Sequence, residues 1–458
     1  MELTWMPAWQ IRQLIGKQEV SPVEVTDHFL GRAEQLDPVL RCFQTLDVAG
    51  AREQARRAEQ AVLHGEDLGA LHGIPVSVKE HIPVSGLPHF PLYAPPPGGG
   101  PAGVSGDLVA RRDAPVVRRL RRAGAVIFGT NVMPGMGSVG LRDRSGDPTT
   151  DLSLHSRNPW DLSRVPGSSS AGGSAAVSAG VIPIAIGSDG GGSTRLPAAW
   201  TGILGLHPTL GRVPMGEPPS IAWNVSHGPL TRDARDGALV LQAVAGPDGA
   251  EVISLQTYPP DYLSEIDAGI EGLRFAWTDD FGYAGRYAGI ESPRVLDAVR
   301  AAADRLTTLG GTVGATDESF EDWMPMLALG ATGMPPATGE AYHAAQDLRR
   351  RWWEGLRRIF TTHDLLLTTT IQHVAFEVER WNDSWTQGLA EFAPMWCAHT
   401  FPHNLLGWPG LAVPCGFVDG LPVSLQITGP PDSEALIYRV ANAFLTAFPL
   451  NERPAVAR

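Results

Sequence analysis

The fold of this chain is organised around a glycine-rich stretch, Gly187-Ser188-Asp189-Gly190-Gly191-Gly192-Ser193-Thr194-Arg195. Three consecutive glycines allow backbone conformations closed to other residues and leave amide N–H groups uncovered, as in an anion-binding loop. The apolar run 181–186 predicts a buried strand before it, and the run 196–200, with Pro197, predicts a helix after it. Ser193 is therefore expected between a strand and a helix, beside free hydrogen-bond donors.

A Gly-Gly-Gly-Ser sequence is also compatible with an ordinary loop or a phosphate-binding loop. The phosphate-binding alternative requires a Gly-Lys-Ser/Thr sequence, which is missing here, and no lysine lies near the stretch. A second serine cluster, Pro166-Gly167-Ser168-Ser169-Ser170-Ala171-Gly172-Gly173-Ser174, precedes the same predicted strand. Two serine-glycine loops flanking one buried strand favour a catalytic site.

Lysine is rare in this chain: Lys17 and Lys79 are the only lysines among 36 basic residues. Lys79 ends the strand-like apolar run 73–79, where a permanent charge is costly. A buried lysine can lose its proton, whereas arginine stays charged. One interpretation is a side chain that reaches the surface or pairs with Glu80. The chemical interpretation is a buried neutral amine that acts as a base.

Periodicity and capping residues predict an alternation of helices and strands. The helices are expected at 10–17, 21–36, 47–64 and 113–123, with Asp113 capping the last, and the other strands at 125–129 and 364–368. This order predicts one α/β domain over 1–458, with a mixed, mostly parallel central sheet covered by helices on both faces. We expect N-terminal helices in 1–65, the catalytic core in 66–230 and a helical, Trp- and Met-rich substrate-covering region in 310–410.

The composition restricts the classes of function. The net charge of −13 argues against nucleic acid or an anionic membrane as a partner and favours a neutral substrate. Three scattered cysteines, no signal-peptide pattern and no apolar run of membrane-spanning length predict a cytoplasmic protein. We expect no metal and no cofactor, because neither His-Glu-x-x-His nor Gly-Lys-Ser/Thr occurs. Gly-x-Ser-x-Gly is also missing, and Cys397 and Cys415 are interpreted as packing residues.

The two serine loops and the Lys79 strand resemble the amidase signature family of serine hydrolases. Further matching segments follow in family order along essentially the whole chain: 36–38, 113–117, 129–131, 157–161, 202–209, 228–230 and 420–427. The chain departs from the family pattern in three places. Glu80-His81 follows the lysine, Ser168 and Ala171 replace glycines, and His207 replaces a lysine.

The resemblance implies a triad in which Ser193 is the nucleophile, Ser169 is a bridging serine on a cis peptide, and Lys79 is the base. It also implies that backbone N–H groups of Gly190, Gly191, Gly192 and Ser193 hold the oxyanion. The cis bond is expected at Ser168-Ser169. The supporting residues are Ser170, Ser188, and Asp189 with Arg195, expected to form an ion pair or a hydrogen-bonded frame.

The expected function is a serine hydrolase that cleaves a C–N bond, other than a peptide bond, of an uncharged, bulky or aromatic amide or carbamate. It would form an acyl- or carbamoyl-enzyme on Ser193, as a urethanase or an aryl acylamidase would. Seven of the thirteen tryptophans fall within 323–408, which indicates either an aromatic wall over the site or helix packing. The expected substrate contacts are Asn131, Met136, Trp323 and Met334.

Two alternatives stay open beside a hydrolase that works alone as a monomer or homodimer. Members of the family also serve as the glutamine-amidohydrolase subunit of tRNA-dependent amidotransferase complexes, so a subunit role is the main alternative. A catalytically inactive binding protein is disfavoured, because Lys79, Ser169 and Ser193 fill all three triad positions.

Overall fold

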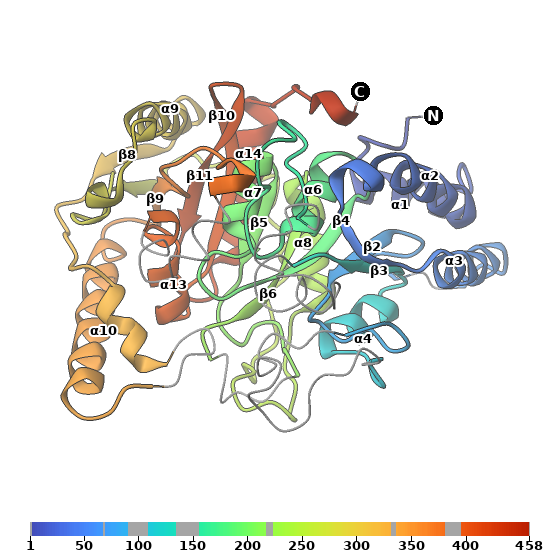
Figure 1. Ribbon diagram of the computed structural model, residues 1–458, viewed down its shortest axis with the longest axis horizontal. Helices are drawn as coiled ribbons and strands as arrows, with labels where there is room; N and C mark the ends of the chain where they lie inside the picture. Colours follow the sequence, from blue (N-terminus) through green and yellow to red (C-terminus); the bar gives the residue numbers. More distant parts are fainter. Residues whose placement is uncertain are drawn as a thin grey trace.

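The computed structural model describes residues 2–66, 69–89, 109–133, 155–216, 223–330, 336–380 and 395–457. These residues form a single-domain α/β fold around one sheet of 11 strands in the order β1-β3-β2-β4-β6-β5-β10-β11-β9-β7-β8 (Figure 1). The strands are β1 (Phe43–Leu46), β2 (Pro75–Lys79), β3 (Val126–Asn131), β4 (Ile184–Asp189), β5 (Leu204–His207), β6 (Ser226–Thr231), β7 (Arg274–Trp277), β8 (Thr312–Ala315), β9 (Leu365–Thr369), β10 (Gly410–Val418) and β11 (Leu421–Thr428).

Helices surround this sheet. They are α1 (Ala8–Gly16), α2 (Pro22–Leu40), α3 (Val48–Leu63), α4 (Pro115–Arg122), α6 (Ala171–Ser178), α7 (Arg195–Thr201), α8 (Ala234–Val244), α9 (Ser292–Asp304), α10 (Glu340–Ile359), α13 (Phe401–Leu406) and α14 (Glu434–Ala447). The local sequence explains where α2 begins. Ser21 caps α2 through the Glu24 N–H, and the Glu24 side chain accepts in return from the Ser21 N–H, with Pro22 in the first turn.

The predicted mixed sheet is confirmed, but the predicted predominance of parallel pairing is wrong. Parallel pairs join β3 to β2, β2 to β4, β9 to β7 and β7 to β8. The six remaining pairs, including all those through the middle of the sheet from β4 to β9, are antiparallel. The reason is that an apolar run indicates a buried strand but not the direction of that strand. Short connections, such as the one between β10 and β11, reverse the chain and make the pair antiparallel.

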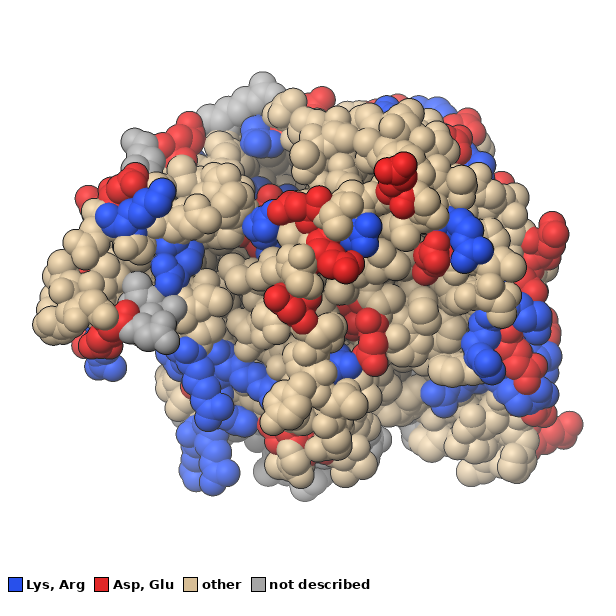
Figure 2. All heavy atoms as spheres, turned by 180° about the vertical axis from the view of Figure 1, so that it is seen from behind, with Lys and Arg blue, Asp and Glu red and all other residues tan. Residues whose placement is uncertain are grey.

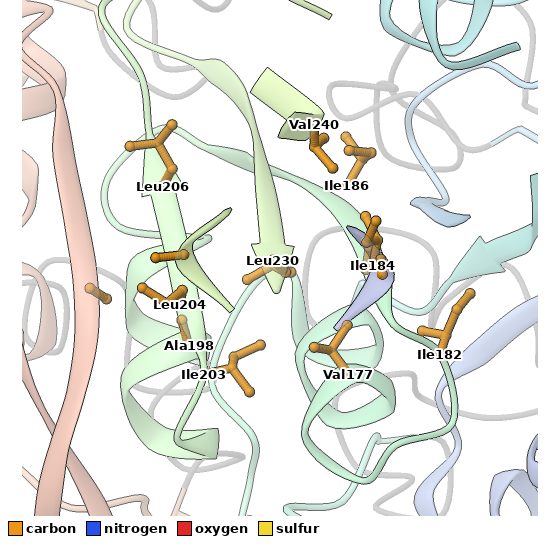
Figure 3. Close-up of a cluster of buried hydrophobic side chains, with 14 of the residues drawn as sticks. Val177, Ile182, Ile184, Ile186, Ala198, Ile203, Leu204, Leu206, Leu230 and Val240 are labelled. Carbon is orange, nitrogen blue, oxygen red and sulfur yellow. The ribbon is translucent and has the colours of Figure 1, made fainter. Parts of the chain in front are cut away.

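Both faces of the central strands are covered, as predicted. On one face, α6 lies so close to β4 that a Cβ on Gly173 would lie 3.1 Å from the Cβ of Ala185. Ile184 and Ile186 alternate with Ala185 and point to the other face, where Figure 3 shows Val240 of α8 beside Ile186. These apolar side chains form part of one continuous buried core that also includes Leu204, Leu206 and Leu230.

Three local expectations need correction. The strand predicted at 181–186 begins only at Ile184, because the N–H groups of Val181 and Ile182 still bond to Ala176 at the end of α6. Asp113 does not cap α4; its carboxylate accepts from the Ser85 N–H and from Arg121 Nε. The region predicted as helical at 310–410 contains β9, which confirms the strand predicted at 364–368, but it also contains β8, which was not predicted.

Charge is unevenly distributed over the face of the molecule that Figure 2 shows. The face in Figure 2 mixes acidic and basic side chains, but basic ones gather at its lower left. This is the corner that α4 occupies, and its last turn carries Arg119, Arg121 and Arg122. Within the described ranges, no helix has both the length and the apolar composition needed to cross a bilayer.

Candidate active site

Three parallel strands deliver their last residues to one edge of the sheet. Lys79 ends β2, Asn131 ends β3, and Asp189 ends β4. Lys79 and Asn131 are direct partners in the parallel register. Because the carboxyl ends of parallel strands share an edge, residues distant in sequence converge there. The two predicted serine loops lie at the same edge, one leading into α6 and the other leading from β4 into α7.

Serine residues surround the Lys79 amine. Its Nζ donates to Ser169 Oγ at 2.7 Å and to Ser170 Oγ at 3.0 Å, and it lies 3.0 Å from Ser188 Oγ and 3.3 Å from the Ser188 carbonyl oxygen. The Lys79 residue is only 1% exposed. Burial lowers the pKa of Lys79 to about 7, although the carboxylates of Asp189 and Glu80 act in the opposite direction. The amine therefore exchanges a proton near neutral pH, and its nearest partner is the predicted bridging serine.

The peptide bond between Ser168 and Ser169 is cis, as predicted. The next residue, Ser170, donates its N–H to the Ser193 carbonyl oxygen at 3.1 Å. This hydrogen bond ties the two serine loops together. Ser193 itself lies half-buried directly before Thr194 and α7. The structure thus brings the end of β2, with Lys79, and the two serine loops, with Ser169 and Ser193, to the same edge of the sheet.

Asp189 forms the predicted ion pair with Arg195, whose Nε lies 3.0 Å from the carboxylate, and both side chains are fully buried. The Asp189 carboxylate also accepts from the N–H groups of Gly192 and Thr194 and from Thr194 Oγ1. Burial acts to raise the pKa of Asp189, but Arg195, His207 and Asn404 together outweigh it and hold the pKa well below its usual value. Asp189 is therefore a charged anchor for the whole loop.

One member of the predicted oxyanion-binding set is already engaged. The Gly192 N–H donates to Asp189 Oδ1 at 2.6 Å, so this donor is turned toward the carboxylate and away from a substrate. Gly192 adopts a φ of +127°, a conformation that favours glycine. Its place in the motif thus reflects backbone geometry. The N–H groups of Gly190, Gly191 and Ser193 are left as the candidate donors.

The predicted substrate contacts have different outcomes. Asn131 is buried in the site, and its Nδ2 donates to the Cys42 carbonyl oxygen. Trp323 is fully buried in an aromatic core cluster, with its ring in edge-to-face contact with Phe401. Trp323 is therefore a core residue in this structure, not part of an open wall. Met136 and Met334 lie outside the described residues.

Several site residues carry no local sequence signal. Thr400, Phe401 and Asn404 come from α13 and the residue before it, more than 200 positions after the glycine loop. The Phe401 ring would lie 3.3 Å from a Cβ built on Gly191. Asn224 donates through Nδ2 to the Gly190 carbonyl oxygen. No motif near these residues marks them, because their place in the site depends on contacts made across the fold.

The structure also bears on two other kinds of chemistry, a cysteine nucleophile and a bound metal ion. Burial raises the pKa of both Cys397 and Cys415 to about 12, so neither forms a thiolate at neutral pH. Within the described part of the chain, no group of three or more His, Cys, Asp or Glu side chains could hold a metal ion.

Comparisons with known proteins identify the family. The Amidase family model matches residues 24–319 and 315–437. The chain belongs to the amidase signature family, whose members are serine hydrolases acting on C–N bonds. It is 32% identical over 499 aligned positions to the A subunit of the glutamyl-tRNA(Gln) amidotransferase of Moorella thermoacetica, covering 97% of each chain. The corresponding subunit of Thermoanaerobacter pseudethanolicus is 31% identical, covering 99% of each chain.

Solved structures share the fold. The A subunit of the glutamyl-tRNA(Gln) amidotransferase of Thermotoga maritima superposes with a TM-score of 0.79 at 25% identity, covering 100% of this chain and 99% of that one. A bacterial aryl acylamidase of the amidase signature family superposes with a TM-score of 0.80 at 24% identity, covering 99% of this chain and 98% of that one. The likeness to the acylamidase concerns the fold.

Proposed function

We propose that this chain hydrolyses an amide C–N bond with Ser193 as nucleophile, Ser169 as proton relay and Lys79 as base. The observation that carries the proposal is the buried Lys79 amine, which has a pKa of about 7 and lies 2.7 Å from Ser169 Oγ. A base works best when its pKa lies near the working pH. An ordinary lysine, with a pKa of about 10.4, would be protonated and unable to accept a proton.

In the proposed reaction, Ser193 Oγ attacks the carbonyl carbon and passes its proton to Ser169 Oγ, while the Ser169 proton moves to Lys79 Nζ. The negative oxygen of the tetrahedral intermediate accepts hydrogen bonds from the N–H groups of Gly190, Gly191 and Ser193. Lys79 then returns the proton through Ser169 to the leaving nitrogen, and the C–N bond breaks. Water attacks the remaining acyl-enzyme along the same path, which releases the acid and restores Ser193.

For the amide, we propose glutamine, with this chain serving as the amidohydrolase subunit of a tRNA-dependent amidotransferase-like complex. The support is the 32% identity over 97% of each chain with a protein named as a glutamyl-tRNA(Gln) amidotransferase subunit. In this role the ammonia released from glutamine passes to a partner subunit. The chain then works with protein partners.

A bulky or aromatic amide or carbamate is the second candidate substrate. The observation that favours it is the Phe401 ring, which packs beside Gly191 of the proposed oxyanion loop with 5% of the residue exposed, so the surroundings of that loop are apolar and aromatic. With an aryl carbamate, the same attack would expel the alcohol. Hydrolysis of the carbamoyl-enzyme would then release the amine and carbon dioxide.

A substrate comparison tests the proposal. The purified chain is assayed with glutamine, small primary amides, anilides and aryl carbamates, with Ser193→Ala as the inactive control and with partner subunits from a related amidotransferase added in parallel. We expect glutamine hydrolysis that increases when partners are present. Turnover of anilides or carbamates without any glutamine hydrolysis would replace glutamine with the second candidate. Equal turnover by Ser193→Ala would contradict the mechanism itself.

A further inference from the structure

The carbonyl groups of the glycine loop are each held by a hydrogen-bond donor. Among the described residues, the four carbonyl oxygens from position 189 to position 192 accept from three side chains and one backbone amide. The pairs are Asp189 O with Asn404 Nδ2 at 2.9 Å, Gly190 O with Asn224 Nδ2, Gly191 O with Thr400 Oγ1 at 2.7 Å, and Gly192 O with the Leu196 N–H at 2.7 Å.

A hydrogen bond that fixes the orientation of a carbonyl group also fixes the orientation of the N–H of the next residue. In a trans peptide the C=O and the following N–H point in opposite directions, because the group is planar. The anchored carbonyl of Asp189 thus directs the Gly190 N–H, and that of Gly190 directs the Gly191 N–H. The anchored Gly192 carbonyl does the same for the Ser193 N–H. These are the three N–H groups left as candidate donors once Asp189 has engaged the Gly192 N–H.

Glycine makes such anchoring necessary. A Gly-Gly peptide can rotate by half a turn with little steric resistance, which would put a carbonyl oxygen where the oxyanion should lie. Asn224, Thr400 and Asn404 are all fully buried, so water does not compete for their hydrogen bonds. Asn404 Nδ2 also lies 3.4 Å from the Asn224 carbonyl oxygen, which links the anchors to one another. A side chain at position 192 would overlap with Thr400 Oγ1.

We propose that Asn224, Thr400 and Asn404 are positioning residues that set the peptide orientations of the oxyanion-binding loop. The inference rests on the proposed function, because it assumes that this loop stabilises a negative oxygen. The three side chains act on the carbonyl side of the loop and need no contact with the substrate. Nothing in the local sequence around them marks this role.

Thr400 and Asn224 allow a matched test. Thr400→Val keeps the shape and removes the donor, whereas Thr400→Ser keeps the donor; Asn224→Asp replaces the donating nitrogen with an oxygen. Loss of one oxyanion donor typically costs about 100- to 1000-fold in kcat, so we expect a fall of about 10- to 1000-fold for Asn224→Asp, which frees the peptide that carries the Gly191 N–H. Thr400→Val frees the peptide that carries the Gly192 N–H, which Asp189 also holds, so its fall in kcat should be smaller, below about tenfold. KM should change by less than about threefold, since the effect belongs to the transition state. Thr400→Ser should stay within about threefold of wild type.

Crystal structures of the same variants separate this inference from the proposed function. We expect a rotated peptide group between Gly190 and Gly191 in Asn224→Asp. We expect a smaller displacement of the next peptide in Thr400→Val, because Asp189 still holds the Gly192 N–H, and the original orientation in Thr400→Ser. This readout stands even if Ser193 proves not to be the nucleophile. An unrotated peptide together with unchanged kcat in Asn224→Asp would overturn the inference. If Thr400→Val does not fold, Thr400→Ala removes the same donor without adding bulk.

Discussion

At the scale of single residues, the surroundings of Lys79 explain why a lysine stands at this position in a chain whose other basic residues are almost all arginines. Its amine is buried among the hydroxyls of Ser169, Ser170 and Ser188, and burial brings its pKa to about 7. Arginine could not lose its proton in the same position. The rarity of lysine made this residue visible in the sequence, because a buried amine can lose its proton and serve as the base that we propose. Thr400 and Asn224 gave no such signal, since ordinary polar residues acquire their role only through the fold.

The pH dependence of the reaction follows from the Lys79 pKa. Activity should rise as pH increases through about 7 and then level off, because the amine is a base only when deprotonated and its pKa lies near that value. Lys79→Arg should lose about 100- to 10,000-fold at every pH, the usual contribution of a general base. The measurement is kcat/KM from about pH 5 to about pH 9.

Lys17→Arg is the matched control, because Lys17 is the other lysine and is exposed at the end of α1. It should leave the profile unchanged. A flat profile in the wild-type protein, or a Lys79→Arg variant with near-normal rates, would show that another group is the base.

At the scale of elements, the Asp189–Arg195 pair joins the end of β4 to the start of α7. Arg195 also donates to Gln426 Oε1 on β11 and Asn404 Oδ1 on α13, so one guanidinium connects four elements. The sequence predicted the pair because the two residues bracket the glycine loop. It could not predict Gln426 or Asn404, which lie more than 200 positions away. Capping signals such as Ser21 and Glu24 were predictable because they act within one turn.

Removing one partner of this buried pair should destabilise the protein. Arg195→Met leaves the Asp189 carboxylate buried without its counter-ion, and we expect the free energy of unfolding to fall by about 3–5 kcal/mol. The comparison is Arg52→Met, because Arg52 pairs with Asp27 at the surface with both side chains about half exposed. That change should cost less than about 1 kcal/mol. Urea denaturation measures both; similar small losses would mean that the buried pair does not hold the loop.

At the scale of the whole molecule, the sequence predicted an α/β domain with one mixed sheet and helices on both faces. It did so because apolar runs and amphipathic segments alternate along the chain. Strand direction was predicted poorly, since the hydrophobic pattern of β10 and β11 does not depend on whether they run parallel or antiparallel. The tryptophans within 323–408 were compatible with either an aromatic wall over the site or helix packing. Trp323, Trp352 and Trp408 are buried in the core. The position of a tryptophan in the sequence indicates that it is buried, but it does not indicate which part of the protein it packs against.

The central claim is that Ser193 is a nucleophile activated by Lys79, and covalent labelling tests it most directly. A fluorophosphonate probe reacts with an activated serine, and mass spectrometry of the digested protein locates the adduct. We predict one modified peptide carrying the probe on Ser193, no adduct in Ser193→Ala, and labelling slowed at least about 100-fold in Lys79→Arg. An adduct on another residue, or undiminished labelling of Ser193→Ala, would contradict the account.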